Sequence, residues 1–390
     1  MIRETGVRTM DKLIGFMIRR ERLNRNYSQE SLCKGICAVS YLSKIEQGQV
    51  EAREDIIRAL LKRLQVHYKN DPEFLTETEG IIDRAYAKIY EMESVTDEIA
   101  YLDKHRLDCL SSRCMLDTLL LTTYVKQKEN TLLDEYASCM NQRQYELYLY
   151  EQCMWGRDKY TELLKLNSNA FYTVSLGVLK CYQGAYQEAI ELLTRGCNIS
   201  CEEGNVRALL NGKVLLGTCY SNLRNNPLMT KHYRAAERIA AALGEQEMID
   251  LIYYNLGATY LDWGMTKEAY ECFDRCEERD VLFHHKFAIC MEKLGRRLQA
   301  MAELMLGYQD ALIEESPVYK EMLDVVRYRL EHEDYLHDEA YDELLTTCFA
   351  HIEEELPEGF ALFHVPYLEE VYQATRRYKD AYLLNKKYTR

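Results

Sequence analysis

Apolar residues recur along most of the chain with the period of an α-helix. In the segment 13–23, for example, Ile14, Met17 and Ile18 fall on one face of a helix. We find no run of alternating β-branched residues bounded by hairpin turns, and only five prolines occur among the 390 residues. The sequence therefore predicts an all-α protein, and its length predicts more than one hydrophobic core.

The first 66 residues predict a small helical domain. The pattern places four helices in it, over residues 13–23, 29–34, 39–47 and 53–64. Ser28 is a suitable N-cap for the second helix, Gly35 makes the turn after it, and Gly48 occupies the C-cap position of the third. The core would be closed by Leu32, Ile36, Leu42, Ile45, Ile56, Ile57, Leu60, Leu61 and Leu64.

The charge of the chain is divided unevenly. Residues 1–70 hold 14 Lys+Arg against 8 Asp+Glu, whereas residues 71–390 hold the remaining 35 of 49 basic and 55 of 63 acidic side chains. A basic head on an acidic body indicates a polyanionic partner for the head. Residues 67–80, which contain Pro72, predict a linker, so the expected domains are 1–66, 67–80 and 81–390.

The body shows internal repeats. Leu176-Gly177, Leu216-Gly217 and Leu256-Gly257 recur at a spacing of 40 residues. A second signal, Gly-x-x-x-x-Ala, follows at Gly184, Gly264 and Gly295. In the middle copy Asn225-Asn226-Pro227 occupies the turn, and the pattern starts its second helix near Tyr233. These repeats predict stacked helical hairpins, in which glycine lets the first helix of a pair approach the second.

The head resembles a known DNA-binding family. Three strings carry the resemblance: Ser28-Gln29-Glu30-Ser31-Leu32, Gly35-Ile36-Cys37 and Tyr41-Leu42-Ser43-Lys44-Ile45-Glu46-Gln47-Gly48. They look like the Xre/Cro-type helix-turn-helix, and the spacing, one residue shorter than the commonest, is similar to the PlcR-like group of peptide-sensing quorum regulators. The resemblance implies that the third helix enters the major groove of a double-stranded DNA operator.

Residue roles in the head follow from that resemblance by position. The expected base-facing residues are Val39, Ser40, Tyr41, Ser43 and Lys44. Gln29 corresponds to the family's backbone-clamping glutamine, and Arg19 and Arg22 are candidates for phosphate contacts. Glu46 is acidic, so we expect it to pair within the domain. For Tyr41, packing on its own domain remains an alternative to base contact.

The body resembles the tetratricopeptide repeat, most closely at Tyr254-Asn255-Leu256-Gly257-Ala258-Thr259-Tyr260 and Ala269-Tyr270-Glu271-Cys272-Phe273. The resemblance implies an α-solenoid whose inner face is built from the first helix of each repeat. Asn side chains among apolar ones suit an extended peptide. The expected peptide-binding residues are Phe171, Tyr182, Asn211, Thr218, Asn222, Tyr254, Asn255 and Asp262. Packing against neighbouring helices is the better interpretation for Val174, Val178 and Leu261.

The resemblance to peptide-sensing regulators implies a transcriptional regulator whose repeat domain binds a short signalling peptide, which alters DNA binding. Since one head contacts few bases, we also expect a homodimer. The alternative is a DNA-anchored adapter whose array docks a protein partner. Residues 1–11 lack the apolar core of a secretion signal, and no apolar stretch reaches the length of a membrane span, so we expect a cytoplasmic protein.

The sequence predicts neither an enzyme nor a cofactor. It contains no phosphate-binding Gly-x4-Gly-Lys loop, no His-Glu-x-x-His and no Gly-x-Ser-x-Gly. Three cysteine pairs lie four residues apart, at Cys33/Cys37, Cys197/Cys201 and Cys272/Cys276, but no histidine pair completes a zinc set. We therefore expect no metal, and we interpret the cysteines as reduced core residues.

Overall fold

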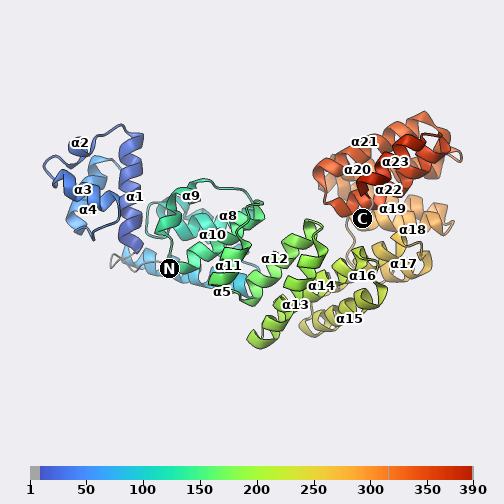
Figure 1. Ribbon diagram of the computed structural model, residues 1–390, viewed down its shortest axis with the longest axis horizontal. Helices are drawn as coiled ribbons and strands as arrows, with labels where there is room; N and C mark the ends of the chain where they lie inside the picture. The colour runs from blue at the N-terminus through green and yellow to red at the C-terminus, as the bar shows by residue number, and fades with distance from the viewer. Residues whose placement is uncertain (1–8, 315, 389–390) are drawn as a thin grey trace. The chain divides into compact units, whose positions relative to one another are not determined.

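The computed structural model describes residues 9–314 and 316–388, and this part of the chain contains helices and no strands (Figure 1). The predicted all-α class is therefore confirmed. None of the described helices is both long and apolar enough to cross a bilayer. Residues 1–8, part of the segment considered for a secretion signal, lie outside the described residues. The chain divides into two compact units, Met1–Leu176 with Arg195–Leu209 and Gly177–Thr194 with Leu210–Arg390.

The head of unit 1 has the four expected helices. They are α1 (Thr9–Asn24), α2 (Gln29–Cys33), α3 (Val39–Glu46) and α4 (Glu54–Arg63). The Ser28 hydroxyl accepts a hydrogen bond from the Ser31 amide and so caps α2, as the sequence predicts. Gly35 and Gly48 both take a positive φ, which reverses the chain after α2 and α3. The predicted core forms as expected, with Leu32, Leu42 and Leu60 fully buried and Ile36 and Ile56 at its edge.

The rest of unit 1 follows without an extended linker. Its helices are α5 (Pro72–Tyr90), α6 (Thr96–Lys104), α7 (Arg106–Leu110), α8 (Met115–Lys126), α9 (Leu132–Tyr136), η1 (Ala137–Cys139), α10 (Gln142–Met154) and α11 (Tyr160–Leu166). The segment 67–80 that the sequence assigns to a linker is helical from Pro72 onward, because Asp71 caps α5 and Leu75 and Thr78 are buried. Arg20 of α1 donates a hydrogen bond to the Tyr136 hydroxyl at 3.2 Å. The head therefore packs against α9 and η1.

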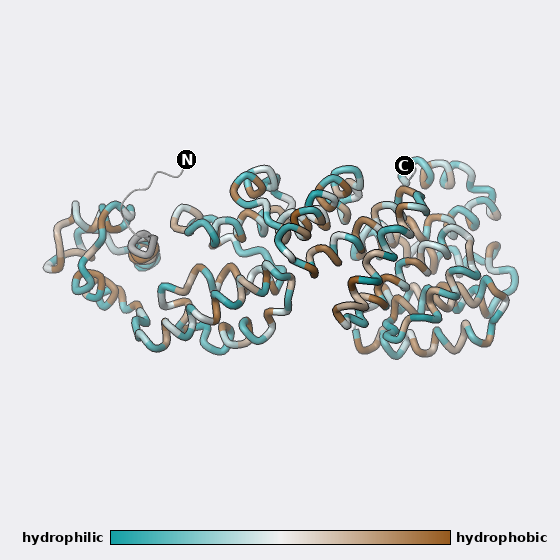
Figure 2. Tube along the Cα trace, turned by 90° about the horizontal axis from the view of Figure 1, so that it is seen from below, coloured by the Kyte–Doolittle hydropathy of each residue, from teal (hydrophilic) through white to brown (hydrophobic). Residues whose placement is uncertain are grey.

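The repeat helices follow. The unit boundary falls within α12 (Ala170–Tyr182), α13 (Tyr186–Glu203) and α14 (Val206–Asn222). The remaining helices belong to unit 2: α15 (Asn226–Leu243), α16 (Gln246–Asp262), α17 (Thr266–Phe273), α18 (Val281–Lys293), α19 (Arg297–Ile313), α20 (Pro317–Glu331), η2 (Tyr335–His337), α21 (Glu339–Glu355), α22 (Glu358–Ala374) and α23 (Tyr378–Tyr388). In unit 2 successive helices pack against one another as hairpins. Brown and teal segments alternate along individual helices, which is the amphipathic pattern of such hairpins (Figure 2).

The repeat glycines lie where two helices of a hairpin cross. A Cβ atom on Gly177 would lie 2.7 Å from a Leu193 side-chain atom, on Gly217 2.7 Å from the Tyr233 ring, and on Gly257 2.8 Å from the Phe273 ring. These distances are too short for a real Cβ contact. The predicted role of glycine, close approach of the paired helices, is therefore confirmed.

The hairpin turns of the first and last repeat form as the sequence predicts. The turn of the middle repeat differs in one detail. Gly184 and Gly264 take a positive φ in the hairpin turns, and Ala269 is fully buried at the next interface. In the middle copy Arg224 takes the positive φ and Asn225 caps α15. The prediction that the second helix begins near Tyr233 is wrong, because this cap and Pro227 in the first turn start α15 at Asn226.

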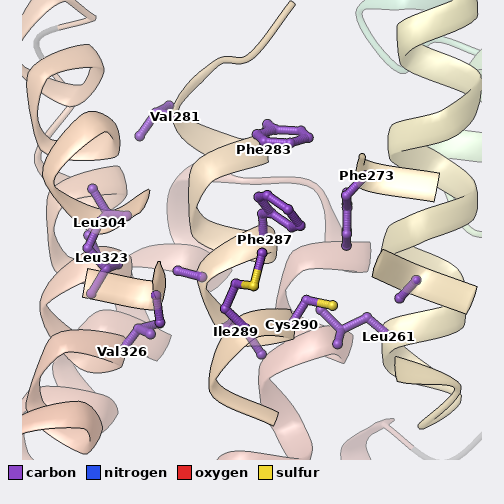
Figure 3. Close-up of a cluster of buried hydrophobic side chains, with 14 of the residues drawn as sticks. Leu261, Phe273, Val281, Phe283, Phe287, Ile289, Cys290, Leu304, Leu323 and Val326 are labelled. Atoms are coloured by element: carbon purple, nitrogen blue, oxygen red, sulfur yellow. The ribbon is translucent and has the colours of Figure 1, made fainter. Parts of the chain in front are cut away.

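A large core cluster of unit 2 surrounds α18. Figure 3 shows the rings of Phe273, Phe283 and Phe287 together, with Leu304 and Leu323 on the other side of the helix. The rings of Phe273 and Phe283 meet edge to face with centroids 5.7 Å apart. Helix α18 is thus enclosed on several sides by apolar side chains.

The glycine contacts predict a measurable effect on stability. Replacing Gly257 with alanine forces a Cβ against the buried Phe273 ring, so we expect the free energy of unfolding to fall by about 1–3 kcal/mol, despite the better helix propensity of alanine. The matched control is Gly359→Ala, since a Cβ there meets nothing within 4 Å. Urea unfolding followed by circular dichroism checks both. Equal stability of the two variants would contradict the crossing role of Gly257.

Candidate functional site

The exposed side of α3 is the candidate DNA interface. Val39 is 43% exposed, and Ser40 and Lys44 are also exposed, because Leu42 and Ile45 turn the opposite side of the helix into the head core. Ser43 is half-buried, and its hydroxyl accepts a hydrogen bond from the Gln47 amide. We call Val39, Ser40, Tyr41, Ser43 and Lys44 the recognition face.

Tyr41 differs from the other residues of the recognition face. Its half-buried ring packs against the head core, and its hydroxyl donates to the Glu51 carbonyl at 3.5 Å. This is the alternative that the sequence left open, packing within its own domain. The exposed part of the recognition face is therefore formed by Val39, Ser40 and Lys44.

A buried ion pair fixes the three helices of the motif. Arg22 of α1 donates from Nε and Nη2 to the two Glu46 carboxylate oxygens, at 2.6 and 2.9 Å, and from Nη1 to the Tyr27 carbonyl. Gln29 of α2 donates to the same carboxylate at 2.8 Å. The hydrogen bond to Glu46 raises the pKa of Arg22 above its ordinary value. The expected structural role of Glu46 is confirmed.

This network corrects the prediction for Arg22. The residue is only 8% exposed, and its guanidinium group is occupied by Glu46 and by Tyr27. It therefore holds α1 against α3 and is not placed to contact a phosphate. Arg19, the other basic candidate, is exposed. The Gln29 side-chain amide donates one N–H to Glu46 and has a second N–H. The network therefore orients the Gln29 side chain and leaves one of its two donors for another partner.

Sequence reasoning missed the contact that seats α1 on α3. A Cβ on Gly15 would lie 1.9 Å from the Ile45 carbonyl oxygen, so only glycine allows this approach. The signal was present as a glycine within an apolar helix, but its meaning depends on a partner 30 residues away. Arg20 was also missed, because its partner Tyr136 lies 116 residues further along the chain.

The candidate peptide-binding residues of unit 2 lie mainly on the first helices of two hairpins, α14 and α16. The two helices are joined at their C-terminal halves, where the hydroxyls of Ser221 and Thr259 are 2.7 Å apart and Arg224 lies 3.6 Å from Asp262. Figure 1 shows α14 and α16 as neighbours within unit 2. The residues Asn211, Thr218, Asn222, Tyr254, Asn255 and Asp262 therefore belong to two adjoining helices, and we call them the inner stripe.

The residues of the inner stripe differ in exposure and in how many of their hydrogen-bonding groups already have a partner within the protein. The Thr218 hydroxyl donates to the Val214 carbonyl and meets the hydroxyl of buried Tyr233 at 3.1 Å. The Asn222 amide donates to the Thr218 carbonyl at 2.9 Å, which leaves its own oxygen as an acceptor. Asn211 is half-buried. Asp262 and Tyr182 are exposed, the latter at 64%.

Phe171 is a wrong prediction. It lies in unit 1, is 3% exposed, and its ring packs among Tyr90, Tyr150 and Tyr172 with centroids 5.0–5.9 Å apart. It is therefore a core residue of that unit. Of the residues expected to pack, Val174 and Leu261 are buried, as predicted, whereas Val178 is half-buried.

Comparisons with known proteins agree with this geometry. Residues 18–69 match the family model described as helix-turn-helix, so the head is a helix-turn-helix domain. The described residues of the chain thus form a helix-turn-helix head followed by a helical repeat region.

Particular relatives follow. The chain is 26% identical over 408 residues to the transcriptional activator NprA of Geobacillus stearothermophilus, covering 90% of this chain and 91% of that protein. The fold resembles a solved Rap protein complexed with competence and sporulation factor, with a TM-score of 0.61 at 14% identity, over 80% of this chain and 96% of that one. Bacillus thuringiensis PlcR, in complex with the peptide PapR7 and DNA, matches at 14% identity over 75% of this chain and 99% of that chain. Its TM-score is 0.30, which is too low to establish a shared arrangement.

Loss of the buried Arg22–Glu46 ion pair should strongly destabilise the head. Glu46→Ala leaves the buried Arg22 guanidinium without a counter-ion, and removing one partner of such a pair costs about 3–5 kcal/mol. We expect hydrogen exchange of the amides of α1–α4 to accelerate accordingly. The matched control is Glu54→Ala, which removes an exposed pair with Arg58 worth about 0–1 kcal/mol. Unchanged exchange in Glu46→Ala would contradict the structural role of this pair.

Proposed function

We propose that the chain is a sequence-specific transcriptional regulator that binds double-stranded DNA through its head and a short signalling peptide through its repeat region, and that the peptide alters DNA binding. The observation that carries the proposal is the combination of an exposed recognition face on α3 with a Rap-like array whose first helices carry asparagine side chains. NprA is a transcriptional activator, which supports the DNA-binding half of the proposal, and the solved Rap protein is complexed with competence and sporulation factor, which supports the peptide-binding half.

DNA recognition rests on α3. Its exposed residues Val39, Ser40 and Lys44 offer a methyl contact, a hydroxyl and an ammonium, which suit base edges in the major groove. Gln29 and Arg19 complete the site as phosphate contacts. Because one head spans few base pairs, we propose a homodimer that reads two half-sites about 34 Å apart.

Peptide recognition rests on the inner stripe. An extended peptide leaves its backbone N–H and C=O groups unpaired, and the amides of Asn211, Asn222 and Asn255 are suited to pair with them. Tyr254 and Tyr182 offer aromatic surface to apolar side chains. The peptide controls DNA binding only if it binds one arrangement of the protein more tightly than another. We propose that this difference in affinity lies in the repeat region.

The recognition face predicts a specific loss of DNA binding. Operator sequences are first selected from random DNA with the wild-type protein. We then expect Ser40→Ala combined with Lys44→Ala to weaken binding to the selected sequence more than tenfold, since each base contact contributes about 1–3 kcal/mol. The control is Lys62→Ala, an exposed lysine on α4 outside the recognition face. Electrophoretic mobility shift measures all three proteins. Wild-type operator affinity in the double variant would contradict the assignment of the recognition face.

The inner stripe predicts a selective loss of peptide response. Asn255 is half-buried and makes no side-chain hydrogen bond to another described residue. We expect Asn255→Ala to weaken binding of peptides encoded by short open reading frames beside the gene about tenfold, which is the cost of one or two lost hydrogen bonds. Operator affinity without peptide should stay unchanged. Calorimetry with the control Gln309→Ala, an exposed amide on α19, checks the result; equal losses in both variants would count against the stripe.

One observation favours the alternative, an adapter that docks a protein partner. The outer helix α15 carries Lys231, Arg234 and Arg238 beside a shallow hollow of about 660 Å³, in a body that is otherwise acidic. Such a face suits an acidic protein surface. If no peptide binds the wild-type protein while the operator experiment succeeds, the adapter becomes the better description of the repeat region.

A further inference from the structure

Helix α18 buries three basic residues in succession. His284, His285 and Lys286 are 4%, 1% and 4% exposed, in a helix whose residues 283–291 are all buried. A helix enclosed on all sides normally carries apolar residues, because a buried charge needs a partner. Each of these three basic side chains is therefore expected to have an acidic or hydrogen-bonding partner.

Two basic side chains in this region, His284 and Arg329, each have an acidic partner. The His284 ring lies 2.7 Å from Glu303 through Nδ1 and 3.5 Å from Asp310 through Nε2. Arg329 of α20 makes a two-point ion pair with Glu292, at 3.0 and 2.6 Å. The nearby acids Glu292, Glu303 and Asp310 are thus already engaged.

The remaining basic groups have no such partner. The Lys286 Nζ lies 2.6 Å from the centre of the Phe363 ring and makes no hydrogen bond or ion pair to a described residue. The His285 and His364 rings stack with centroids 5.4 Å apart, and His285 Nδ1 and His364 Nε2 are buried without a hydrogen-bond partner. We call His285, Lys286 and His364 the basic cluster; it joins α18 to α22.

Burial disfavours the charged forms of the basic cluster. Desolvation lowers the pKa of Lys286 and of His285 well below their ordinary values, and lowers the pKa of His364 to about 3. Asp262 of α16 raises the pKa of Lys286, but less than burial lowers it. The basic cluster therefore has one nearby acid, Asp262, whose effect is smaller than that of burial.

The basic cluster continues the inner stripe. The turn glycine Gly295 follows Gly264 by 31 residues, so position 257 of α16 corresponds to position 288 of α18. By the same shift, Tyr254 and Asn255 correspond to His285 and Lys286. The cluster thus occupies on α18 the positions that the inner stripe occupies on α16, one hairpin earlier.

We propose that the basic cluster binds a carboxylate of the peptide ligand, with Lys286 as its ion-pair partner and His285 and His364 as hydrogen-bond donors. This proposal rests on the proposed function and specifies it: the ligand is an acidic peptide. A carboxylate supplies the counter-charge that the cluster lacks, and a charge-assisted pair in a dry site is strong. The carboxylate is either an Asp or Glu side chain or the free C-terminus.

Binding then takes up protons, and this fixes its pH dependence. Burial lowers the pKa values of Lys286, His285 and His364 in the free protein, and a bound carboxylate would raise them, so the complex binds more protons. Affinity therefore increases as pH falls from 8 to 6. The other groups facing the cluster are Asp262 on α16, His284 and Glu292 on α18, Arg329 on α20 and Tyr367 on α22. Arg329 stays paired with Glu292, so it does not reverse this sign.

The test uses pools of heptapeptides and the full chain. One pool carries Asp or Glu at a random position, the second carries Asn or Gln instead, and each is made with a free and with an amidated C-terminus. We expect the wild-type protein to bind an acidic or free-carboxylate pool at least tenfold more tightly than the neutral amidated pool, by fluorescence anisotropy at pH 7. The amidated acidic pool separates a side-chain carboxylate from the terminal one.

Lys286→Met keeps the shape of the side chain and removes the ammonium. We expect this variant to lose the preference but to bind the neutral amidated pool as the wild type does. Lys267→Met, an exposed lysine on α17, should behave as the wild type. His364→Phe keeps the stacked ring and should flatten the rise in affinity between pH 8 and 6.

The outcomes are distinct. Binding of all pools without an acidic preference, or a preference that survives Lys286→Met, overturns the carboxylate site and leaves the proposed peptide function standing. Binding of no pool overturns both. Loss of neutral-pool binding in Lys286→Met shows that the residue only supports the fold, and this also overturns the site.

Discussion

The repeat region depends on the close crossing of two helices within each hairpin. At Gly177, Gly217 and Gly257 the backbone of the first helix lies directly against a large side chain of the second, sixteen residues later. This contact fixes which side of the first helix faces its partner. Within the inner stripe, Asn222 and Asp262 each lie five residues after the glycine of their helix, so the crossing holds these two side chains on corresponding sides of α14 and α16. The geometry of the candidate site therefore follows from a packing constraint.

Sequence was sufficient for features that depend on local signals. The four helices of the head, the Ser28 cap and the repeat glycines were predicted, because caps, turns and helical periods are set by neighbouring residues. Arg22 and Phe171 were misassigned, because both are buried by partners far along the chain, Glu46 for the first and Tyr90 for the second. The segment 67–80 looked like a linker from Pro72, yet proline in the first turn of a helix favours its start.

Two sets of buried ionisable side chains, one in the head and one around α18, differ in how they are satisfied. In the head, Arg22, Glu46 and Gln29 form a closed network in which the carboxylate receives three hydrogen bonds. Such a network holds one arrangement of three helices and suits a domain that presents a fixed face to DNA. Around α18, His285 Nδ1 and His364 Nε2 are buried without a hydrogen-bond partner, and Lys286 packs against the Phe363 ring. An incomplete network is costly in a folded protein, and ligands that complete it gain that free energy on binding.

This contrast offers a physical basis for a sensor. A regulator needs a rigid part that reads DNA and a part whose free energy changes with the ligand. The head is suited to the first role, since Gly15 and the Arg22–Glu46 pair leave α1 and α3 little freedom to move apart. The hairpin of α18 is suited to the second, since burial next to Phe363 lowers the pKa of Lys286 and a counter-charge would offset this effect. Because α22 supplies both Phe363 and His364, a carboxylate entering the cluster must act on the contact between α18 and α22. That contact is consequently where peptide binding would be converted into a change of helix packing.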